Sequence, residues 1–298
     1  MPSRHATLIA NPKTGRYGSR RLRPIADVAS QLRSLGLDVE LKLTSAPGEA
    51  TEIAARAARN GTSDVIVAGG DGTINEAIQG LAGSKARLAI IPRGTGNVLA
   101  RELKLPLDDA QATVVAARGN VRRIHLGLAI DEKTNSKRYF VLMAGIGLDA
   151  SVVRRVHPRL KKRIGRAAFW ISGLSHLADW QPAPFKLEIE GRTYIGTFAA
   201  IGKAARYGGD LAITPGARLD EPEFEICIIE TLNRFGYLRL LAYALRTGMP
   251  RDKHGVRFVK ASHVRATGNA PVQVDGEVIG ELPMRFEIAS ESLEVIVP

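Results

Sequence analysis

The sequence predicts two domains: an N-terminal α/β domain with a parallel sheet, and a C-terminal domain of mainly antiparallel β-strands. Over about the first 121 residues, short apolar strands alternate with helices, a pattern typical of parallel sheets. After that point, alternating strands follow one another and are joined by polar turns. The chain of 298 residues is 45% hydrophobic, which is enough for a sizeable core and favours two domains. We expect domains over residues 1–121 and 122–283, with residues 284–298 returning to the first domain.

The first strand is predicted at residues 6–10 and ends in a polar turn at 11–16. Open α/β sheets bind ligands at the carboxyl ends of their strands, so this turn is a candidate binding segment. A basic helix with one apolar face follows over about 19–34.

The next elements repeat this strand–helix alternation. A strand at 38–44 precedes a helix over about 47–61, which closes with an Asn-Gly pair typical of helix C-caps. The third strand, at 65–68, is short and β-branched, as a buried parallel strand should be. Thr73 is predicted to cap the helix after it.

A Gly-Gly-Asp-Gly turn joins this third strand to its helix at residues 69–72. Glycines let an anion approach the backbone N–H groups, and a helix N-terminus adds partial positive charge. Asp71 is the unusual residue, because a carboxylate beside a phosphate needs a bridging cation or a hydroxyl to orient. The turn therefore suggests phosphate binding, and the alternative is a tight loop with a solvated Asp.

A fourth strand at 88–91 ends in the turn at 92–97, and a helix is predicted over 98–103. Strands that alternate with helices form parallel sheets, so the turns after the first, third and fourth strands should lie at one edge.

The second half begins with strands at 122–130 and 138–144. The sequence then places Gly145, Gly147 and Ala150 in a pattern like the fingerprint of dinucleotide-binding folds. A dinucleotide oxidoreductase is a disfavoured alternative, because the surrounding hairpins do not supply the βαβ unit that the fingerprint requires.

A dense basic segment at 154–166 leads into an apolar helix, and a further helix is predicted over 233–247. The basic segment is either a solvated surface or a contact for anionic headgroups or ATP phosphates. The remaining strands are predicted at 186–189, 193–201, 224–229 and 292–297, and residues 271–277 are predicted to alternate as a strand that places its acids in a turn.

The bulk properties limit the class of partner. A formal net charge of +12 indicates a partner with negative charge, namely a phosphorylated substrate, anionic lipid or nucleic acid. Aromatic residues make up only 5%, so a nucleic-acid partner is not expected. Cys227 is the only cysteine and no apolar run reaches membrane-spanning length, so we expect a cytoplasmic protein that contacts the inner face of the membrane peripherally.

Five motifs in this order resemble those of the diacylglycerol kinase catalytic family. They are Asn-Pro-x-x-Gly at 11–15, Gly-Gly-Asp-Gly-Thr-x-Asn-Glu at 69–76, Pro-x-Gly-Thr-x-Asn at 92–97, Gly-Ile-Gly-Leu-Asp-Ala at 145–150 and Asp-Gly-Glu at 275–277. The resemblance covers nearly the whole chain. It implies an N-terminal nucleotide-binding fold related to NAD kinase and phosphofructokinase, with an active site in the cleft between the two domains.

The same resemblance implies the site residues. Asp71 would act on the phosphates, on their catalytic Mg²⁺ or on the acceptor hydroxyl. Asp275 or Glu277 would be the general base, a choice that spacing leaves open. Asp149 would lie near the acceptor hydroxyl, and Asp220 or Glu221 would bind a metal ion. ATP would be held by residues of the turns: Asn11, Pro12, Lys13, Thr14, Gly15, Arg16, Thr44, Gly69, Gly70, Asp71, Gly72, Thr73, Ile74, Asn75 and Thr95.

Three departures separate this chain from the bacterial diacylglycerol kinase pattern. Val98 and His125 stand where that pattern commonly has Asp, and Pro222 replaces a Gly in the acidic turn. The first two suggest that a carboxylate network around a structural metal is missing, and the motif around Val98 is closer to sphingosine-kinase-like members.

We therefore expect an ATP- and Mg²⁺-dependent lipid kinase that transfers the γ-phosphate to a lipid hydroxyl, with diacylglycerol or a sphingoid base as candidate acceptors. The expected partners are the lipid and an anionic membrane surface contacted by 154–166, with a homodimer left open. The alternatives are a soluble NAD kinase and a basic lipid- or nucleotide-binding module without turnover.

Overall fold

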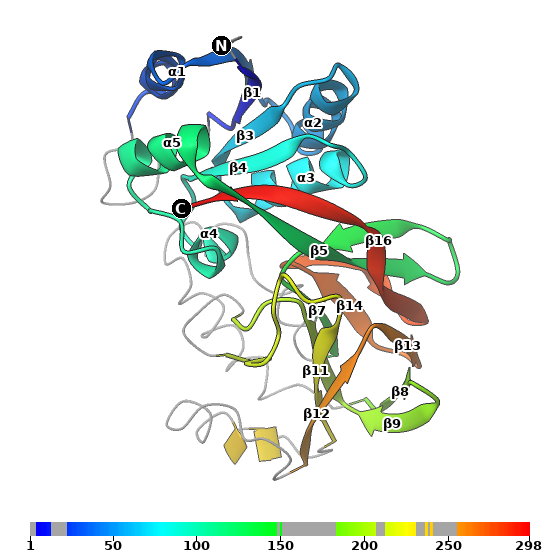
Figure 1. The fold of residues 1–298 in the computed structure, drawn as a ribbon. Helices are drawn as coiled ribbons and strands as arrows, with labels where there is room; N and C mark the ends of the chain where they lie inside the picture. Colours follow the sequence, from blue (N-terminus) through cyan, green and yellow to red (C-terminus); the bar gives the residue numbers. More distant parts are fainter. Residues whose placement is uncertain are drawn as a thin grey trace. The chain divides into compact units, whose positions relative to one another are not determined.

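The computed structural model describes residues 4–12, 23–147, 150, 183–206, 212–230, 236–237, 239–240 and 255–298. The chain forms two compact units, of which unit 1 comprises Met1–Ile124 with Glu291–Pro298 and unit 2 comprises His125–Ser290 (Figure 1). Two strands, β5 (Asn120–Asp131) and β16 (Met284–Val297), have residues in both units.

Unit 1 contains a parallel sheet with the strand order β2-β1-β3-β4. The C-terminal part of β16 lies beside β4 as a further parallel strand, with Val295 paired to Leu88. Every residue of β3 is buried, as expected for the centre of an α/β sheet. These strands confirm the predicted parallel sheet, and their bounds are β1 Arg4–Ala10, β2 Leu37–Leu43, β3 Asp64–Gly69 and β4 Arg87–Pro92.

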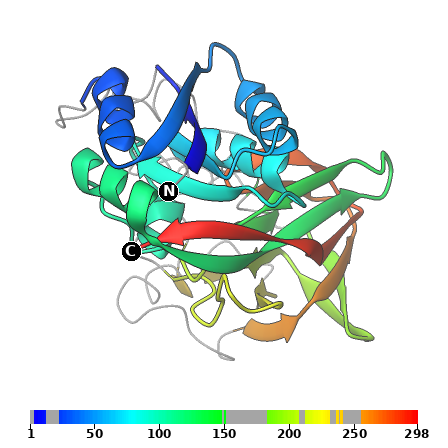
Figure 2. The same cartoon turned by 45° about the horizontal axis from the view of Figure 1, so that its top comes forward.

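Helices cover both faces of this sheet (Figure 2). α1 and α5 pack together on one face, where Leu32 and Ala112 meet Leu8 and Ile66 of the strands, and α2 and α3 pack together on the other. Among the described residues, no helix has the length and apolarity that crossing a bilayer requires. The helices are α1 Ile25–Ser34, α2 Glu49–Arg59, α3 Asp71–Leu81, α4 Val98–Glu102 and α5 Asp109–Arg118.

Helix α3 begins earlier than predicted. The sequence suggests Thr73 as its cap, whereas the helix starts at Asp71 with Gly70 at the N-cap in an extended conformation. Asp71 is well suited to this position because acidic side chains in a first helical turn interact favourably with the helix dipole. Asp71 and Gly72 therefore belong to the first turn of the helix and not to a loop before it.

Gly80 allows α2 and α3 to pack closely. A Cβ atom at Gly80 would lie 2.3 Å from the Thr51 carbonyl oxygen and 2.8 Å from the Ala55 nitrogen, both in the backbone of α2. Backbone atoms of a packed helix cannot move aside as a flexible side chain can, so this position requires glycine.

Unit 2 is built from antiparallel strands in two sheets, which confirms the predicted β domain. One sheet has the order β12-β11-β10-β7-β14-β15, and the other joins β16, β13, β8 and β9, with β5 paired to β16 and β6. The first sheet consists of β7 Met143–Gly147, β10 Phe198–Gly202, β11 Phe224–Ile229, β12 Val256–Ala261, β14 Pro271–Val274 and β15 Glu277–Glu281. The second adds β6 Lys137–Phe140, β8 Phe185–Ile189, β9 Arg192–Gly196 and β13 His263–Thr267 to β5 and β16.

Apolar side chains from strands of both sheets form the core of unit 2. Phe140 of β6 stacks on Phe224 of β11 with ring centroids 5.7 Å apart, so a contact between strands of different sheets lies at the centre of this core. Gly127 makes room for the Phe140 ring, since a Cβ at that position would lie 2.2 Å from its Cζ.

Two predicted strands are wrong because the chain changes sheet within them. The predicted strand at 138–144 divides into β6 and β7, and the one at 193–201 divides into β9 and β10. Both predictions follow a continuous apolar pattern, which persists across a corner because the residues on either side of it are buried in the same core.

Candidate active site

The three predicted turns of unit 1 lie together at the carboxyl ends of β1, β3 and β4, as the parallel topology requires. Asn11, after β1, donates from Nδ2 to Thr73 Oγ1 at 3.5 Å. Thr44, after β2, donates its backbone N–H to the Ala10 carbonyl at 2.9 Å. The Arg93 N–H after β4 donates to the Gly69 carbonyl at 2.8 Å. These bonds hold the turns as one surface.

Two glycines from different turns approach each other closely. A Cβ at Gly94 would lie 2.7 Å from the Cα of Gly70, and a Cβ at Gly70 would lie 3.2 Å from the Cα of Gly94. The turn that contains Gly94 and Thr95 is closed by Asn97, whose side chain accepts from the Gly94 N–H at 2.8 Å and donates to its carbonyl at 2.9 Å. Asn97 has a φ of 50°, a left-handed conformation that Asn tolerates.

The Asp71 carboxylate reaches across to this third turn. Its Oδ1 accepts from the Val98 N–H at 2.7 Å, so Asp71 caps α4, whose own N-cap residue Asn97 makes no such bond. A Cβ at Gly96 would lie 2.9 Å from Asp71 Oδ2. Burial raises the pKa of the Asp71 carboxyl, opposed by hydrogen bonds from backbone N–H groups around the start of α4.

The remaining residues of the central motif have structural partners. Ile74 is 1% exposed and packs in the core, and its N–H donates to the Gly70 carbonyl at 3.1 Å. Asn75 is buried and accepts from Gln79 Nε2 at 2.8 Å. Glu76 accepts from the Ala50 N–H at 3.3 Å, which links α3 to α2. Within residues 69–73, the residues that are not buried are thus Gly70, Asp71 and Gly72.

In unit 2, the predicted acids Asp275 and Glu277 occupy the hairpin between β14 and β15. Asp275 and Gly276 both have positive φ, 47° and 85°, as tight two-residue hairpins require. The Asp275 carboxylate accepts three backbone N–H bonds, from Val141 at 2.8 Å and from Leu142 and Met143 at 2.9 Å each. It thereby holds the corner between β6 and β7.

Glu277 is different from Asp275 in its surroundings. Its side chain is 60% exposed, and its Oε2 accepts from Arg138 Nη2 at 2.5 Å. The two acids that the sequence could not distinguish therefore differ: Asp275 is a partly buried anchor of the backbone, and Glu277 is an accessible carboxylate beside a guanidinium.

The acidic turn that precedes β11 pairs its carboxylates with cations. Asp220 accepts from Arg218 at 3.2 Å, and Glu221 contacts Arg218 at 3.1 Å and Lys260 at 3.6 Å. Among the described residues, no three His, Cys, Asp or Glu side chains are grouped so that they could hold a metal ion. Nothing in this turn matches a carboxylate-based metal site, and the ligand roles expected for Asp220 and Glu221 stay predictions.

Some predicted residues lie outside the described part of the chain. These are Lys13, Thr14, Gly15, Arg16, Asp149 and the basic segment 154–166. His125, one of the departures from the family pattern, lies in β5, where its N–H donates to the Leu219 carbonyl at 2.8 Å.

Sequence reasoning missed two buried charged residues that support these turns. Arg93 lies in the third motif, and its Nη2 pairs with Asp109 Oδ2 at 3.0 Å, with both side chains less than 10% exposed. Lys203, after β10, is fully buried; burial lowers the pKa of its amine to about 8, while the carboxylates of the acidic turn raise it. A charged residue directly after an apolar strand was the available signal for Lys203, but one sequence does not show its partners.

Comparisons with known proteins cover both units. Residues 5–129 match the family described as "Diacylglycerol kinase catalytic domain", and residues 143–297 match the "YegS C-terminal NAD kinase beta sandwich-like domain". A diacylglycerol kinase of Staphylococcus saprophyticus is 31% identical over 301 residues, covering 99% of this chain and 96% of the relative. One of Bacillus subtilis is 29% identical over 302 residues, covering 99% and 97%.

A solved structure agrees at the level of the fold. The crystal structure of a diacylglycerol kinase from Bacillus anthracis str. Sterne superposes with a TM-score of 0.74 at 20% identity, over 99% of this chain and 97% of that one. Two family matches that together span nearly all of the sequence, and full-length relatives at about 30% identity, lead to one assignment. The chain belongs to the diacylglycerol kinase family.

Proposed function

We propose that this protein is an ATP-dependent lipid kinase that transfers the γ-phosphate to a lipid hydroxyl. The observation that carries the proposal is that the turns after β1, β3 and β4 are connected by hydrogen bonds and include the start of α3. The chain that contains them belongs to the diacylglycerol kinase family. Relatives named diacylglycerol kinase support a lipid as the acceptor.

The phosphates of ATP would be held by the backbone of Gly69–Gly72. Glycine at positions 69, 70 and 72 leaves no side chain in front of the N–H groups, and the N-terminus of α3 adds partial positive charge. Asn11, Thr44, Thr73 and Thr95 would border the nucleotide on the neighbouring turns, with Pro12 to Arg16 completing the first turn.

Mg²⁺ would enter with ATP and offset the charge that develops on the transferred phosphoryl group. The donor available for it in unit 1 is the Asp71 carboxylate, of which Oδ1 already accepts the Val98 N–H and Oδ2 is the second oxygen. We therefore assign Asp71 to the nucleotide and its cation, and not to a structural metal.

Glu277 is our candidate for the general base. A base must accept a proton from the acceptor hydroxyl, and the 60% exposed Glu277 side chain is reachable by a substrate. The hydrogen bond from Arg138 Nη2 to Oε2 orients this side chain. The Asp275 carboxylate is engaged by three backbone N–H groups, which suits a positioning residue.

The acceptor would be presented at an anionic membrane surface, at the inner face of the membrane. Seven basic residues and no acidic ones occur at 154–166, a composition that binds anionic headgroups. Asp149 would lie near the acceptor hydroxyl. Sedimentation of the purified protein would decide between a monomer and a homodimer.

The proposal is tested by incubating the protein with labelled ATP, Mg²⁺ and a panel of acceptors. The panel contains diacylglycerol, sphingoid bases, ceramide, phosphatidylglycerol and NAD. We expect label in one lipid and none in NAD. Labelled NAD would instead identify a soluble NAD kinase, and ATP binding without any labelled product would identify a module without turnover.

A further inference from the structure

Lys203 is the most deeply buried cation among the described residues of unit 2. It follows β10 directly, and its exposed fraction is 0%. Lysine is almost never fully buried unless its ammonium group is paired, because removing the charge from water is costly. The partners of this ammonium therefore indicate what it does.

Those partners are backbone carbonyl groups of the acidic turn. Nζ donates to the carbonyl oxygens of Arg218 at 2.9 Å and Glu223 at 3.3 Å, and also to that of Glu221. A lysine ammonium carries three N–H donors and no acceptor, so three carbonyls satisfy it completely. The backbone carbonyls of the turn thus surround the Lys203 ammonium group.

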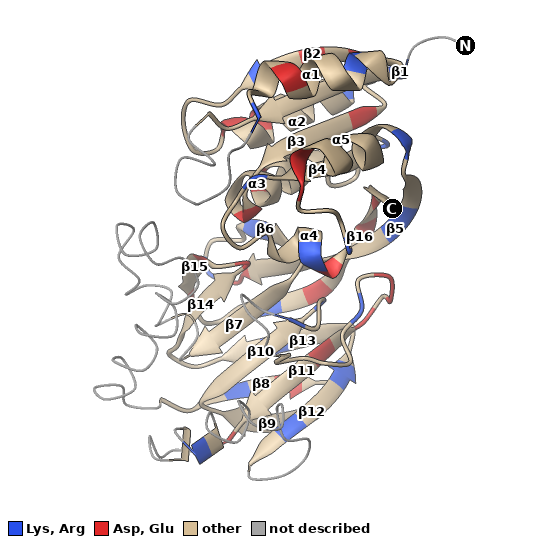
Figure 3. Cartoon of the chain, turned by 90° about the vertical axis from the view of Figure 1, so that its left-hand side faces the viewer, with Lys and Arg blue, Asp and Glu red and all other residues tan. Residues whose placement is uncertain are grey.

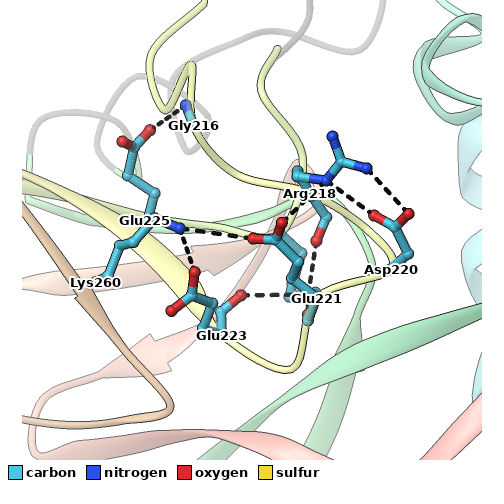
Figure 4. Close-up of polar contacts among 8 residues, drawn as sticks. Gly216, Arg218, Asp220, Glu221, Glu223, Glu225 and Lys260 are labelled. Carbon is cyan, nitrogen blue, oxygen red and sulfur yellow. Dashed lines mark hydrogen bonds and ion pairs between the residues drawn. The ribbon is translucent and has the colours of Figure 1, made fainter.

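The carboxylates of the same turn are engaged by other cations. Asp220 and Glu221 contact Arg218, and Glu221 and Glu223 contact Lys260 (Figure 4). The Arg218 and Lys260 side chains are 58% and 52% exposed, so these are surface ion pairs. The turn therefore has buried carbonyls around Lys203 and carboxylates directed to exposed basic side chains.

This arrangement does not fit a metal ion. Ca²⁺ and Mg²⁺ require six or more oxygen ligands at about 2.0–2.6 Å, including carboxylates. Here the enclosed oxygens number three, two of them lie at ordinary hydrogen-bond distances, and the enclosed group is already a cation. We propose that the Lys203 ammonium is the built-in cation of the turn at 218–223, occupying the place that a structural metal ion would take.

Lys203 also connects this turn to the corner that Asp275 holds. The backbone N–H groups of Lys203 and Ala204 donate to the Leu142 carbonyl at 2.9 and 3.0 Å. The Leu142 N–H donates to the Asp275 carboxylate at 2.9 Å. One residue thus joins the acidic turn, the β6–β7 corner and the hairpin of Glu277 through protein hydrogen bonds.

The first test uses the unaltered protein without nucleotide, after dialysis into metal-free buffer. We expect its thermal unfolding midpoint to be the same with EDTA, Mg²⁺ or Ca²⁺, and elemental analysis to find no stoichiometric metal. A midpoint that falls with EDTA and is restored by Mg²⁺ or Ca²⁺, or one tightly held metal ion per chain, would overturn the proposal. This readout is independent of whether the protein phosphorylates any lipid.

The second test compares Lys203→Met with the matched control Lys260→Met. Methionine keeps an unbranched side chain, one heavy atom shorter, but leaves three buried carbonyls unpaired, so we expect the unfolding midpoint to fall by roughly 5–10 °C. Lys260 forms only exposed ion pairs with the same turn, and its loss should change the midpoint by less than about 2 °C. Equal effects of the two substitutions would overturn the proposal.

A third measurement covers the case in which Lys203→Met does not fold. Lysines of the native, unaltered protein are acetylated and located by mass spectrometry. We expect Lys260 to react and Lys203 to stay protected until the protein is unfolded. Acetylation of Lys203 at the rate of Lys260 in the native protein would overturn the proposal.

Discussion

At the scale of single residues, Asp71 has a structural role as the cap of α4 and a proposed chemical role at the nucleotide and its cation. Its Oδ1 caps α4 through the Val98 N–H, and burial raises the pKa of the same carboxyl. A hydrogen-bond acceptor alone would be enough for the cap, and any N-cap residue type could provide it. The cap does not explain why this side chain is ionisable at a position where burial disfavours its charged form, and a charged carboxylate is what the cation of the nucleotide would require.

Substitutions at Asp71 can separate these two roles. Asparagine is as good a cap as aspartate, so Asp71→Asn should leave the free energy of unfolding within about 0.5 kcal/mol and lower turnover by roughly 100-fold or more. Asp71→Ala should lower turnover equally and also lose about 1 kcal/mol of stability. Urea unfolding and a kinase assay of both variants check this. Normal turnover in Asp71→Asn would refute the chemical assignment.

The hairpin acids give a second prediction. Glu277→Gln should reduce kcat by roughly 100-fold or more without changing the unfolding midpoint, because its side chain is largely exposed. Asp275→Asn should lower the midpoint, since an amide group cannot accept all three backbone N–H bonds. Full activity in Glu277→Gln, together with loss of activity at an unchanged midpoint in Asp275→Asn, would move the base to Asp275.

A third residue prediction concerns acid stability. Arg265 donates to both carboxylate oxygens of Glu132, at 2.9 and 3.0 Å, and these bonds hold the pKa of Glu132 below its ordinary value. A folded-state pKa below the unfolded one gives stability that is present above about pH 4.3 and lost as the pH falls through the folded value. The stability difference between the protein and Glu132→Gln, measured by urea unfolding, should therefore shrink between about pH 5 and pH 3. A difference that grows on acidification would contradict it.

At the scale of elements, the contact between α2 and α3 depends on a residue type that helix propensity disfavours. Gly80 is in the last turn of α3, where alanine would favour the helix by roughly 1 kcal/mol. The approach of the α2 backbone to within 2.3 Å of a Cβ at that position outweighs this preference. Packing, and not propensity, determines the residue at position 80.

We predict that Gly80→Ala lowers the free energy of unfolding by about 1–3 kcal/mol because it forces the two helices apart. The matched control is Gly72→Ala in the first turn of the same helix, where a Cβ meets no atom within 4 Å. That change should be neutral or should stabilise by up to about 1 kcal/mol. Urea unfolding of both variants measures these changes in the free energy of unfolding. If Gly80→Ala leaves the free energy of unfolding unchanged, the helices can separate at little cost, which would contradict the prediction.

The sequence predicted the strands correctly where the local pattern of apolar residues agrees with their burial in the structure. The strands at 6–10, 65–68 and 224–229 were predictable because their apolar runs end at turn residues, and the turns follow from strand direction alone. Helix α5 was not predicted, because its buried Ala112, Thr113 and Ala116 form a weak apolar face. The change of sheet after Phe140 was not predicted, because the residues before and after it are both apolar. Contacts between residues far apart in the sequence, such as those of Lys203 with the carbonyls of 218–223, produce no periodic pattern, so they could not be predicted.

At the scale of the whole molecule, the positive charge is unevenly distributed along the chain. In unit 2, β8 carries one basic and one acidic residue, Lys186 and Glu188, and the charged residues of β9 and β12 are basic (Figure 3). The segment 154–166, outside the described residues, carries seven basic residues of the 42 in the chain. A concentrated positive segment is the part of the molecule most able to hold it at an anionic bilayer.

Charge reversal tests that assignment. The double variant Lys161→Glu with Lys162→Glu should bind vesicles containing anionic lipid more weakly and raise the apparent KM for a vesicle-borne acceptor, by roughly 1 kcal/mol of binding per charge removed. The control reverses two exposed lysines elsewhere, Lys85 and Lys186, and so has the same net charge. Vesicle co-sedimentation at low and high salt measures both. Equal weakening in both variants would assign the effect to net charge and not to this segment.

Unit 1 is formed by two separate segments of the chain, and this affects the order in which it can fold during translation. Its sheet takes a strand from residues 291–298, which the ribosome adds only after the whole of unit 2 has been synthesised. Until then, β4 has an open edge beside Leu88, the kind of edge that pairs with other chains. Although unit 1 is translated first, its sheet is therefore completed last, and a nascent chain that stalls before residue 291 is exposed to aggregation.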